Sequence, residues 1–446
     1  MIFGRDFDKS YFLLVLPVLR MTLPWLQYRL RAIFILPFIL LWCVCMLAKP
    51  IRSPIPGSAT LRKYFLGTAV LHMMYKLLPL SHGLVGSYGR FSFNLYGFLS
   101  DIVMNLALLL VVYMSFVNQK FKELKFLGLV IIGGLLFTGA MTFQYGSEIE
   151  EGAARLIVAS QNGLAADTLK VSDAQDLIVE AGLAGYAFMY IYAFLAPAFF
   201  YAAYKVRTKA AKILFLLVGC ANVFCIKEGG LQTPVIVLLL GMCLMLIAVL
   251  FRLRSSLILF GIISAVLLFV FAVKPQAFSI VELPVRWCAD MVEREVYKAR
   301  LESIADAVSK SSLGAYVTER YARQKMSFDG FWSQYFLFGG GLKTKNGGHS
   351  EILDLMSAYG LMGLSVLVLY FICYKNFYDQ LSKMYLGRQW QPMVLVYLGA
   401  YCFAGIANPI PTGSGQLYIV FPVLAMYFPD SPVGRYLAAT NRGGLL

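Results

Sequence analysis

Apolar runs of about 17–23 residues recur along the whole chain, and short clusters of charged residues separate them. An α-helix rises 1.5 Å per residue, so about 20 residues cross the roughly 30 Å of hydrocarbon in a bilayer. Lipid offers no hydrogen bonds to exposed backbone, so runs of this length must be helices, and the strict alternation typical of barrel strands is absent. The pattern therefore predicts an all-α polytopic membrane protein.

The composition excludes a soluble globular protein of this length. Hydrophobic residues make up 59% of the 446 positions and charged residues only 14%, whereas soluble domains carry roughly 25% charged residues. We expect about 11 or 12 transmembrane helices in one membrane domain, residues 1–446. Eleven spans are predicted near residues 32–48, 64–80, 99–117, 126–145, 183–204, 212–227, 232–251, 256–273, 352–374, 392–407 and 416–428. Arg20 and Pro24 interrupt the stretch 11–27, which is either a twelfth span or a helix lying in the interface.

Lysine and arginine gather in every second loop, and this bias gives the expected orientation. The basic loops contain Lys49, Arg52, Arg62 and Lys63; Lys120, Lys122 and Lys125; Lys205, Arg207, Lys209 and Lys212; Arg252 and Arg254; and Lys375, Lys383 and Arg388. These loops are predicted to be cytoplasmic, so the net charge of +15 reflects topology and gives no reason to expect nucleic acid as a partner.

Two long segments are predicted on the opposite, extracytoplasmic face. One is the acidic loop 146–182. The other is a large loop subdomain, 274–351, between the spans near 256–273 and 352–374. Loops of this length in a compact fold are usually functional.

The large loop ends in a basic, glycine-rich stretch suited to binding phosphate. Arg320 and Arg323 are three residues apart and share one face of a helix, and arginine binds phosphate oxygens in bidentate fashion. Gly339 and Gly341 flank a third glycine, and backbone without side chains lets N–H groups approach an anion. The plainer alternative is that both arginines are solvated loop charges.

Polar residues at the start of the span near 352–374 form a second candidate cluster. Ser350 is expected to cap this helix. His349 then lies at the positive end, where the helix dipole disfavours imidazolium and leaves a neutral base. Glu351 follows, and Asp354 lies one turn into the span, where a carboxylate usually faces a cavity or a partner. The alternatives are a surface position for His349 and an interfacial ion pair for the carboxylates.

Other polar positions have both a functional and a structural interpretation. Arg90 lies in a predicted extracytoplasmic loop, as a substrate ligand or as a headgroup anchor. Lys227 lies at an extracytoplasmic tip, where it binds substrate or pairs locally with Glu228. His72 and Lys76 share a helix face and are expected to line the bundle in a structural role. The chain has three histidines and no Walker, G-x-S-x-G or H-E-x-x-H motif, so no metal or cofactor is predicted.

The stretch from Arg320 to Gly363 resembles the signature region of the bacterial O-antigen ligase and Wzy-type repeat-unit polymerase superfamily. In that family a large late loop carries an arginine, an aromatic stretch, a Gly-x-Gly turn and a histidine with a polar neighbour. A helix with a Gly-hydrophobic-hydrophobic-Gly step follows. The corresponding elements here are Arg320 or Arg323, Phe331 to Phe338, Gly339-Gly340-Gly341, His349-Ser350, and Tyr359-Gly360-Leu361-Met362-Gly363. The chain departs from the family at Lys227, where a Ser-Arg-Gly-like element is usual and no arginine is present.

The resemblance implies a metal-independent glycosyltransferase on the outer face of the bacterial inner membrane. The donor would be a growing glycan on undecaprenyl diphosphate, and the acceptor a sugar hydroxyl of a second lipid-linked repeat unit. Arginines suit the charge that develops on a diphosphate leaving group, and the acceptor needs a base. The implied diphosphate ligands are Arg320, Arg323, Arg90 and Lys227; the base is His349, with Glu351 as substitute or orienting partner; and Gly339, Gly341 and Asp354 support them. A chain-length regulator protein is the expected protein partner.

Two other functions stay open. An O-antigen ligase of the same superfamily would transfer finished polymer to lipid A core, and the motif does not separate it from a polymerase. A lipid-linked oligosaccharide flippase or other transporter belongs to a different class. A flippase would be expected to lack so large an outside subdomain and to hold its cations inside the bundle. Here the basic residues gather outside around the glycines, so the flippase ranks third.

Overall fold

The computed structural model describes residues 7–48, 57–82, 95–101, 105–145, 186–229, 232–250, 286–287, 289–290, 298, 302, 316–333, 336–340, 350–407 and 415–442. All regular elements over these residues are helical, so the all-α prediction is confirmed for this part of the chain. The predicted span 256–273 and the predicted loop 146–182 lie outside the described residues, as does most of the predicted loop 274–351.

The chain divides into two compact units. The bundle unit contains Met1–Phe251, Ser365–Tyr401 and Ile410–Leu446. The loop unit contains Arg252–Leu364 and Cys402–Pro409. The loop unit thus holds the predicted large loop together with the start of the helix that follows it.

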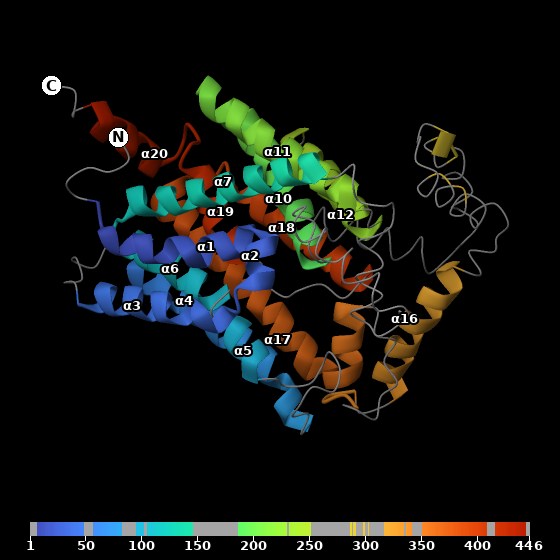
Figure 1. The fold of residues 1–446 in the computed structure, drawn as a ribbon. Helices are drawn as coiled ribbons and strands as arrows, with labels where there is room; N and C mark the ends of the chain where they lie inside the picture. The colour runs from blue at the N-terminus through green and yellow to red at the C-terminus, as the bar shows by residue number, and fades with distance from the viewer. Residues whose placement is uncertain are drawn as a thin grey trace. The chain divides into compact units, whose positions relative to one another are not determined.

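The helices of the bundle unit coincide with most of the predicted spans (Figure 1). Those that lie wholly in this unit are, in chain order, η1 (Lys9–Leu14), α1 (Val15–Thr22), α2 (Pro24–Arg29), η2 (Ala32–Phe34), α3 (Leu36–Leu47), α4 (Ser58–Leu77), η3 (Leu78–His82), α5 (Leu95–Asp101), α6 (Ala107–Val117), α7 (Phe121–Tyr145), α10 (Tyr186–Lys205), α11 (Lys209–Gly229), α12 (Gln232–Leu250), the π-helical turn η7 (Ser382–Leu386), α19 (Gly415–Ala425) and α20 (Pro432–Arg442). The loop unit contains α16 (Tyr316–Ser333), the first part of α17 (Glu351–Leu381) and the last residues of α18 (Gln391–Ala407).

Helix α10 lies at the centre of the bundle unit. Its side chains from Phe188 to Ala203 are almost all buried, and it packs beside α11 and α12. Helix α11 in turn contacts α7 (Figure 1). Large apolar side chains stay exposed on outer helices, among them Leu40, Leu41 and Val44 on α3 and Ile213 and Leu217 on α11. Helices that are apolar on their outer surface as well are typical of a membrane environment.

Among the residues that the structure describes, three helical segments are long and apolar enough to cross a membrane: Phe121–Gln144, Lys209–Gly229 and Glu351–Leu386. They match the predicted spans near 126–145, 212–227 and 352–374. Shorter apolar helices cover Leu36–Met46, Ala107–Val117, Thr233–Val249 and Gln391–Ile406. By length and composition, these segments agree with an all-α membrane protein.

The stretch 11–27 does not form one continuous helix. Pro24 begins α2 after a break at Leu23, and α1 alone has eight residues, or about 12 Å, which is too short to cross the hydrocarbon. Helix α1 packs against α7 instead. The Arg20 side chain is 5% exposed, and its Nε donates to the Leu30 carbonyl at 2.5 Å. The interruptions therefore divide this stretch into short helices, with Arg20 buried in the first of them.

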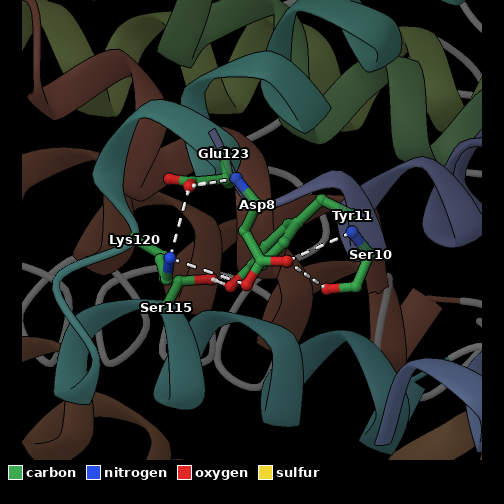
Figure 2. Close-up of polar contacts among 6 residues, drawn as sticks. All are labelled: Asp8, Ser10, Tyr11, Ser115, Lys120 and Glu123. Carbon is green, nitrogen blue, oxygen red and sulfur yellow. Dashed lines mark hydrogen bonds and ion pairs between the residues drawn. The ribbon is translucent and has the colours of Figure 1, made fainter. Parts of the chain in front are cut away.

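A polar cluster joins the N-terminal segment to the connection between α6 and α7 (Figure 2). The Asp8 N–H donates to Glu123 Oε1 at 2.9 Å, and Lys120 Nζ lies 3.6 Å from Asp8 Oδ2 and 3.7 Å from Glu123 Oε1. The Tyr11 hydroxyl lies 2.8 Å from the Ser115 hydroxyl. One lysine thus lies between two carboxylates, as buried charges require, and the cluster fixes η1 against the bundle.

Candidate functional site

Helix α16 carries the two predicted phosphate-binding arginines. Arg320, Arg323 and Ser327 are spaced three and four residues apart, so they lie along one stripe of this helix. Ser327 is fully buried and Arg323 is partly buried, so this stripe faces the interior of the loop unit at least from Arg323 onward. The helix and the shared face were both predicted, whereas the inward position of the stripe was not.

Ser350 caps the N-terminus of α17, as predicted. Its hydroxyl accepts from the Leu353 N–H at 3.1 Å, which satisfies one of the free donors in the first turn. The same hydroxyl donates to the carbonyl of Gly405 at 3.0 Å. One serine therefore starts α17 and attaches it to the end of α18.

Asp354 joins α17 to α16. Its carboxyl group is fully buried; Oδ2 accepts from the Ser350 N–H at 3.1 Å, and Oδ1 accepts from the Ser327 hydroxyl. A buried carboxylate requires such donors, and the N-terminus of a helix stabilises its negative charge. The expectation that this carboxylate faces a partner is thus met by a serine on α16.

Glu351 begins α17 on the same side as Asp354, three residues earlier, and is 6% exposed. A Cβ atom added to Gly405 would lie 3.7 Å from the Glu351 Cβ. A side chain at position 405 would therefore press on Ile352, whose Cγ1 lies 3.1 Å from the added Cβ, and would be in ordinary contact with Glu351. The end of α18, the start of α17 and the middle of α16 converge around these two carboxylates.

Helix α17 is broken at Gly360, although the sequence predicted a continuous span near 352–374. Gly360 has φ 61° and ψ −150°, a conformation essentially reserved for glycine. In a continuous helix the Leu361 N–H would donate to the Ser357 carbonyl and the Met362 N–H to the Ala358 carbonyl. The break diverts both donors.

The turn 336–340 takes over the backbone groups freed by this break. Two of its carbonyls accept hydrogen bonds from α17, and one of its N–H groups donates to a carbonyl of α17. These bonds replace the ones lost within α17, so the buried backbone groups keep hydrogen-bond partners. The bonds are Leu361 N–H to Phe336 O at 3.0 Å, Met362 N–H to Leu337 O at 3.0 Å, and Gly340 N–H to Ser357 O at 3.2 Å.

Two glycines make this contact sterically possible. A Cβ on Gly339, which has φ 73°, would lie 2.3 Å from the carbonyl carbon and oxygen of Ala358. A Cβ on Gly360 would lie 2.5 Å from the Phe336 carbonyl oxygen and 2.6 Å from the Gly339 nitrogen. The close backbone approach expected at Gly339 is therefore an approach to α17.

The remaining predicted residues are placed less fully or elsewhere. His349, Gly341 and Arg90 lie outside the described residues. Lys227 lies in the last turn of α11, in the bundle unit, and its Nζ is 3.6 Å from Glu228 Oε1. This is the local ion pair that the sequence left open for Lys227.

His72 and Lys76, expected to line the bundle, share one acidic partner. Asp101 contacts the His72 ring through Oδ2, and its Oδ1 lies 3.3 Å from Lys76 Nζ. The Asn105 side chain donates to the same Oδ1 at 2.8 Å. The cluster ties α4 to α5 and agrees with the expected structural role.

Sequence reasoning missed Ser327 and Gly405 of the loop unit, and it named Gly360 as part of the family's glycine step without predicting the break there. Ser327 could have been found from its spacing, since it follows Arg323 by one helical turn on the same face. For Gly360 the signal was a glycine inside an apolar run, which is also common in uninterrupted helices.

Among the described residues, no group of three or more histidine, cysteine, aspartate or glutamate side chains could hold a metal ion. No protein-family model matches the chain, and no curated protein matches it at a significant level.

Proposed function

We propose that this chain is a multi-pass enzyme of the bacterial inner membrane that joins undecaprenyl-diphosphate-linked repeat units on the outer face. The observation that carries the proposal is the attachment of α16 to the start of α17. The Ser327–Asp354 hydrogen bond holds the arginine-bearing stripe of α16 against a capped helix N-terminus with two carboxylates. The proposal takes Arg320 and Arg323 of α16 as the cationic groups and the residues at the start of α17 as the acid–base groups, the two kinds of group that glycosyl transfer from a diphosphate requires.

In this proposal the arginines stabilise the leaving group. The Arg323 residue is partly buried, and charge stabilisation is stronger where water is partly excluded. Arg320 lies one turn earlier on the same face of α16. Arg90 is a further candidate ligand. Lys227 ranks behind the arginines, because the chain carries no arginine at this position, where a Ser-Arg-Gly-like element is usual in the family it resembles.

The acid–base step is assigned to His349 and Glu351, which precede and follow the capping residue Ser350. The acceptor oxygen forms a bond to the anomeric carbon of the donor, and the bond from that carbon to the diphosphate oxygen breaks. The electron pair leaves with the diphosphate, and the hydroxyl proton passes to His349 or to Glu351. Asp354 acts as a positioning residue, since its oxygens accept from Ser327 and Ser350.

Deleting the gene in its host and separating the surface glycans on a gel tests the reaction class. A single repeat unit on its normal anchor, with the ladder lost, supports the polymerase. Long polymer stalled on undecaprenyl diphosphate would instead identify a ligase. Lipid-linked units trapped on the cytoplasmic side would identify a flippase and overturn the roles given to Arg320 and His349.

Substitutions on α16 test the residue assignment. Arg323→Ala is expected to lower polymer formation by about 100-fold or more, the order seen when one charge-stabilising group is removed. Lys325→Ala is the matched control, because Lys325 is exposed on the same helix, and it should leave the ladder intact. Full-length polymer from both Arg320→Ala and His349→Ala, at unchanged protein levels, would refute the assignment.

A further inference from the structure

The loop unit exposes a set of large apolar side chains close together in sequence. Exposed fractions reach 60% for both Trp332 and Phe338. The set, called the aromatic patch below, consists of Phe328 (46%), Trp332, Phe336 (38%), Leu337 (58%) and Phe338. Concentrated apolar exposure of this kind marks an interaction surface rather than ordinary protein surface.

The aromatic patch is ordered by its own ring contacts. The Trp332 and Phe336 rings stack with centroids 5.3 Å apart and an interplanar angle of 22°. Both rings also contact Phe331, at 5.1 and 5.0 Å, and Phe331 is only 3% exposed. The buried ring anchors the exposed ones, so the patch presents a fixed surface.

Hydrogen bonds to α17 fix the position of the aromatic patch along the axis of that helix. Phe336 and Leu337 accept hydrogen bonds from Leu361 and Met362, directly after the break at Gly360. Before the break α17 carries two carboxylates, whereas residues 361–374 contain no charged side chain. The patch is therefore joined to α17 where the helix changes from polar to apolar.

The candidate span that includes α17 is longer than the hydrocarbon of a bilayer is thick. Glu351–Leu386 has 36 residues, and the 26 that follow the break at Gly360 rise by about 39 Å, which exceeds the roughly 30 Å of hydrocarbon. The charged first turns can thus remain outside the hydrocarbon while the apolar part crosses it. The break at Gly360 then falls near the bilayer boundary.

The charges around the aromatic patch complement a membrane surface. Residues 316–346 contain five basic and two acidic side chains, and Lys325 is exposed on α16. Tryptophan and other aromatic side chains beside basic residues are typical of elements in the interface, where the rings enter the headgroup region and the cations meet anionic lipids.

We infer that the aromatic patch docks into the bilayer–water interface and holds the start of α17 at a fixed height above the hydrocarbon. Asp354 precedes Gly360 by six residues, about 9 Å along the helix. The Ser327–Asp354 contact would then lie at the depth of lipid headgroups. This inference concerns membrane docking and does not depend on glycosyl transfer.

Tryptophan quenching in nanodiscs tests the docking. The full-length protein is placed in phosphatidylglycerol with phosphatidylcholine brominated at the 6 and 7 positions of one acyl chain, and separately exposed to aqueous iodide. The variant Trp332→Phe keeps a ring in the stack. The difference in emission between the unaltered protein and this variant is assigned to Trp332. Trp42→Phe is the control, because Trp42 is fully buried and neither quencher should reach it.

The expected result is that the emission assigned to Trp332 is quenched by the brominated lipid and little affected by iodide. Quenching by iodide alone would place the aromatic patch in water and overturn the inference. Protection from both quenchers would show that protein covers the patch, which also overturns it. Leu337→Trp adds an indole to the patch and should show the same preference for the brominated lipid, independently of any change caused by removing Trp332.

Discussion

Replacing Gly360 with alanine should detach the turn 336–340 from α17. An alanine at this position would place its Cβ 2.5 Å from the Phe336 carbonyl oxygen and 2.6 Å from the Gly339 nitrogen. Both are backbone atoms, which cannot move aside as the end of a flexible side chain can. Alanine also favours the helical backbone conformation, which Gly360 does not adopt. The substitution therefore destabilises the state in which the turn is attached to α17 and stabilises the state in which it is detached.

The magnitude follows from these two effects. A non-glycine residue held at φ 61° and ψ −150° costs about 1–3 kcal/mol. In the straightened helix, alanine gains roughly 0.5–1 kcal/mol over glycine. The backbone clash adds to this difference, so the attached state should lose about 3 kcal/mol or more relative to the detached one. At 1.4 kcal/mol per factor of ten, the detached population rises at least about 100-fold.

Amide hydrogen exchange measures this population directly. The Gly340 N–H, which donates to Ser357 at 3.2 Å, should exchange about 100-fold faster in Gly360→Ala than in the unaltered protein. The matched control is Gly133→Ala, because an added Cβ on this helical glycine of α7 would meet nothing within 4 Å. That control should leave the Gly340 exchange rate unchanged and stabilise α7 slightly.

A second glycine provides the test of mechanism. Gly339→Ala breaks the same contact from the other side, since its Cβ would lie 2.3 Å from the Ala358 carbonyl. The double variant should therefore behave like either single variant, with clearly non-additive effects. A Gly360→Ala protein whose Gly340 exchange stays within about threefold of the original would refute the role given to the turn.

Three further substitutions probe the buried polar contacts. Ser327→Ala should lower the free energy of unfolding by about 1.5–3 kcal/mol in a detergent titration, because it removes a donor to the buried Asp354 carboxylate; an unchanged midpoint would contradict this contact. Tyr11→Phe should cost about 1 kcal/mol and should have no further effect when Ser115 is already alanine. Asp101→Leu should lower the thermal midpoint, since its histidine and lysine partners on α4 lose their shared carboxylate, and a raised midpoint would show that the cluster is not stabilising.

The helices and the cap could be predicted because their causes are local. Apolar runs of bilayer length predicted the spans now seen as α7, α11 and α17. Ser350 was predicted as a cap from its position before an apolar run, and its hydroxyl accepts the Leu353 N–H as expected. The shared face of Arg320 and Arg323 followed from helical spacing alone.

The break in α17 and the partner of Asp354 could not be predicted in the same way. Each depends on residues about 20 or more positions earlier in the chain: the carbonyls of the turn 336–340 and the hydroxyl of Ser327. A single glycine in an apolar run does not reveal whether another segment supplies replacement hydrogen bonds. Likewise, a carboxylate near a helix N-terminus does not name its donor.

The polar cluster around Lys120 has a consequence for the order in which the chain is completed during synthesis. Asp8 donates its backbone N–H to Glu123, 115 residues later, and the Thr22 carbonyl accepts from Thr138, 116 residues later. A ribosome adding about 5–20 residues per second needs roughly 6–23 s to make this intervening length. The N-terminal segment therefore leaves the ribosome well before its partners exist, and it reaches its final position only once α7 has been made.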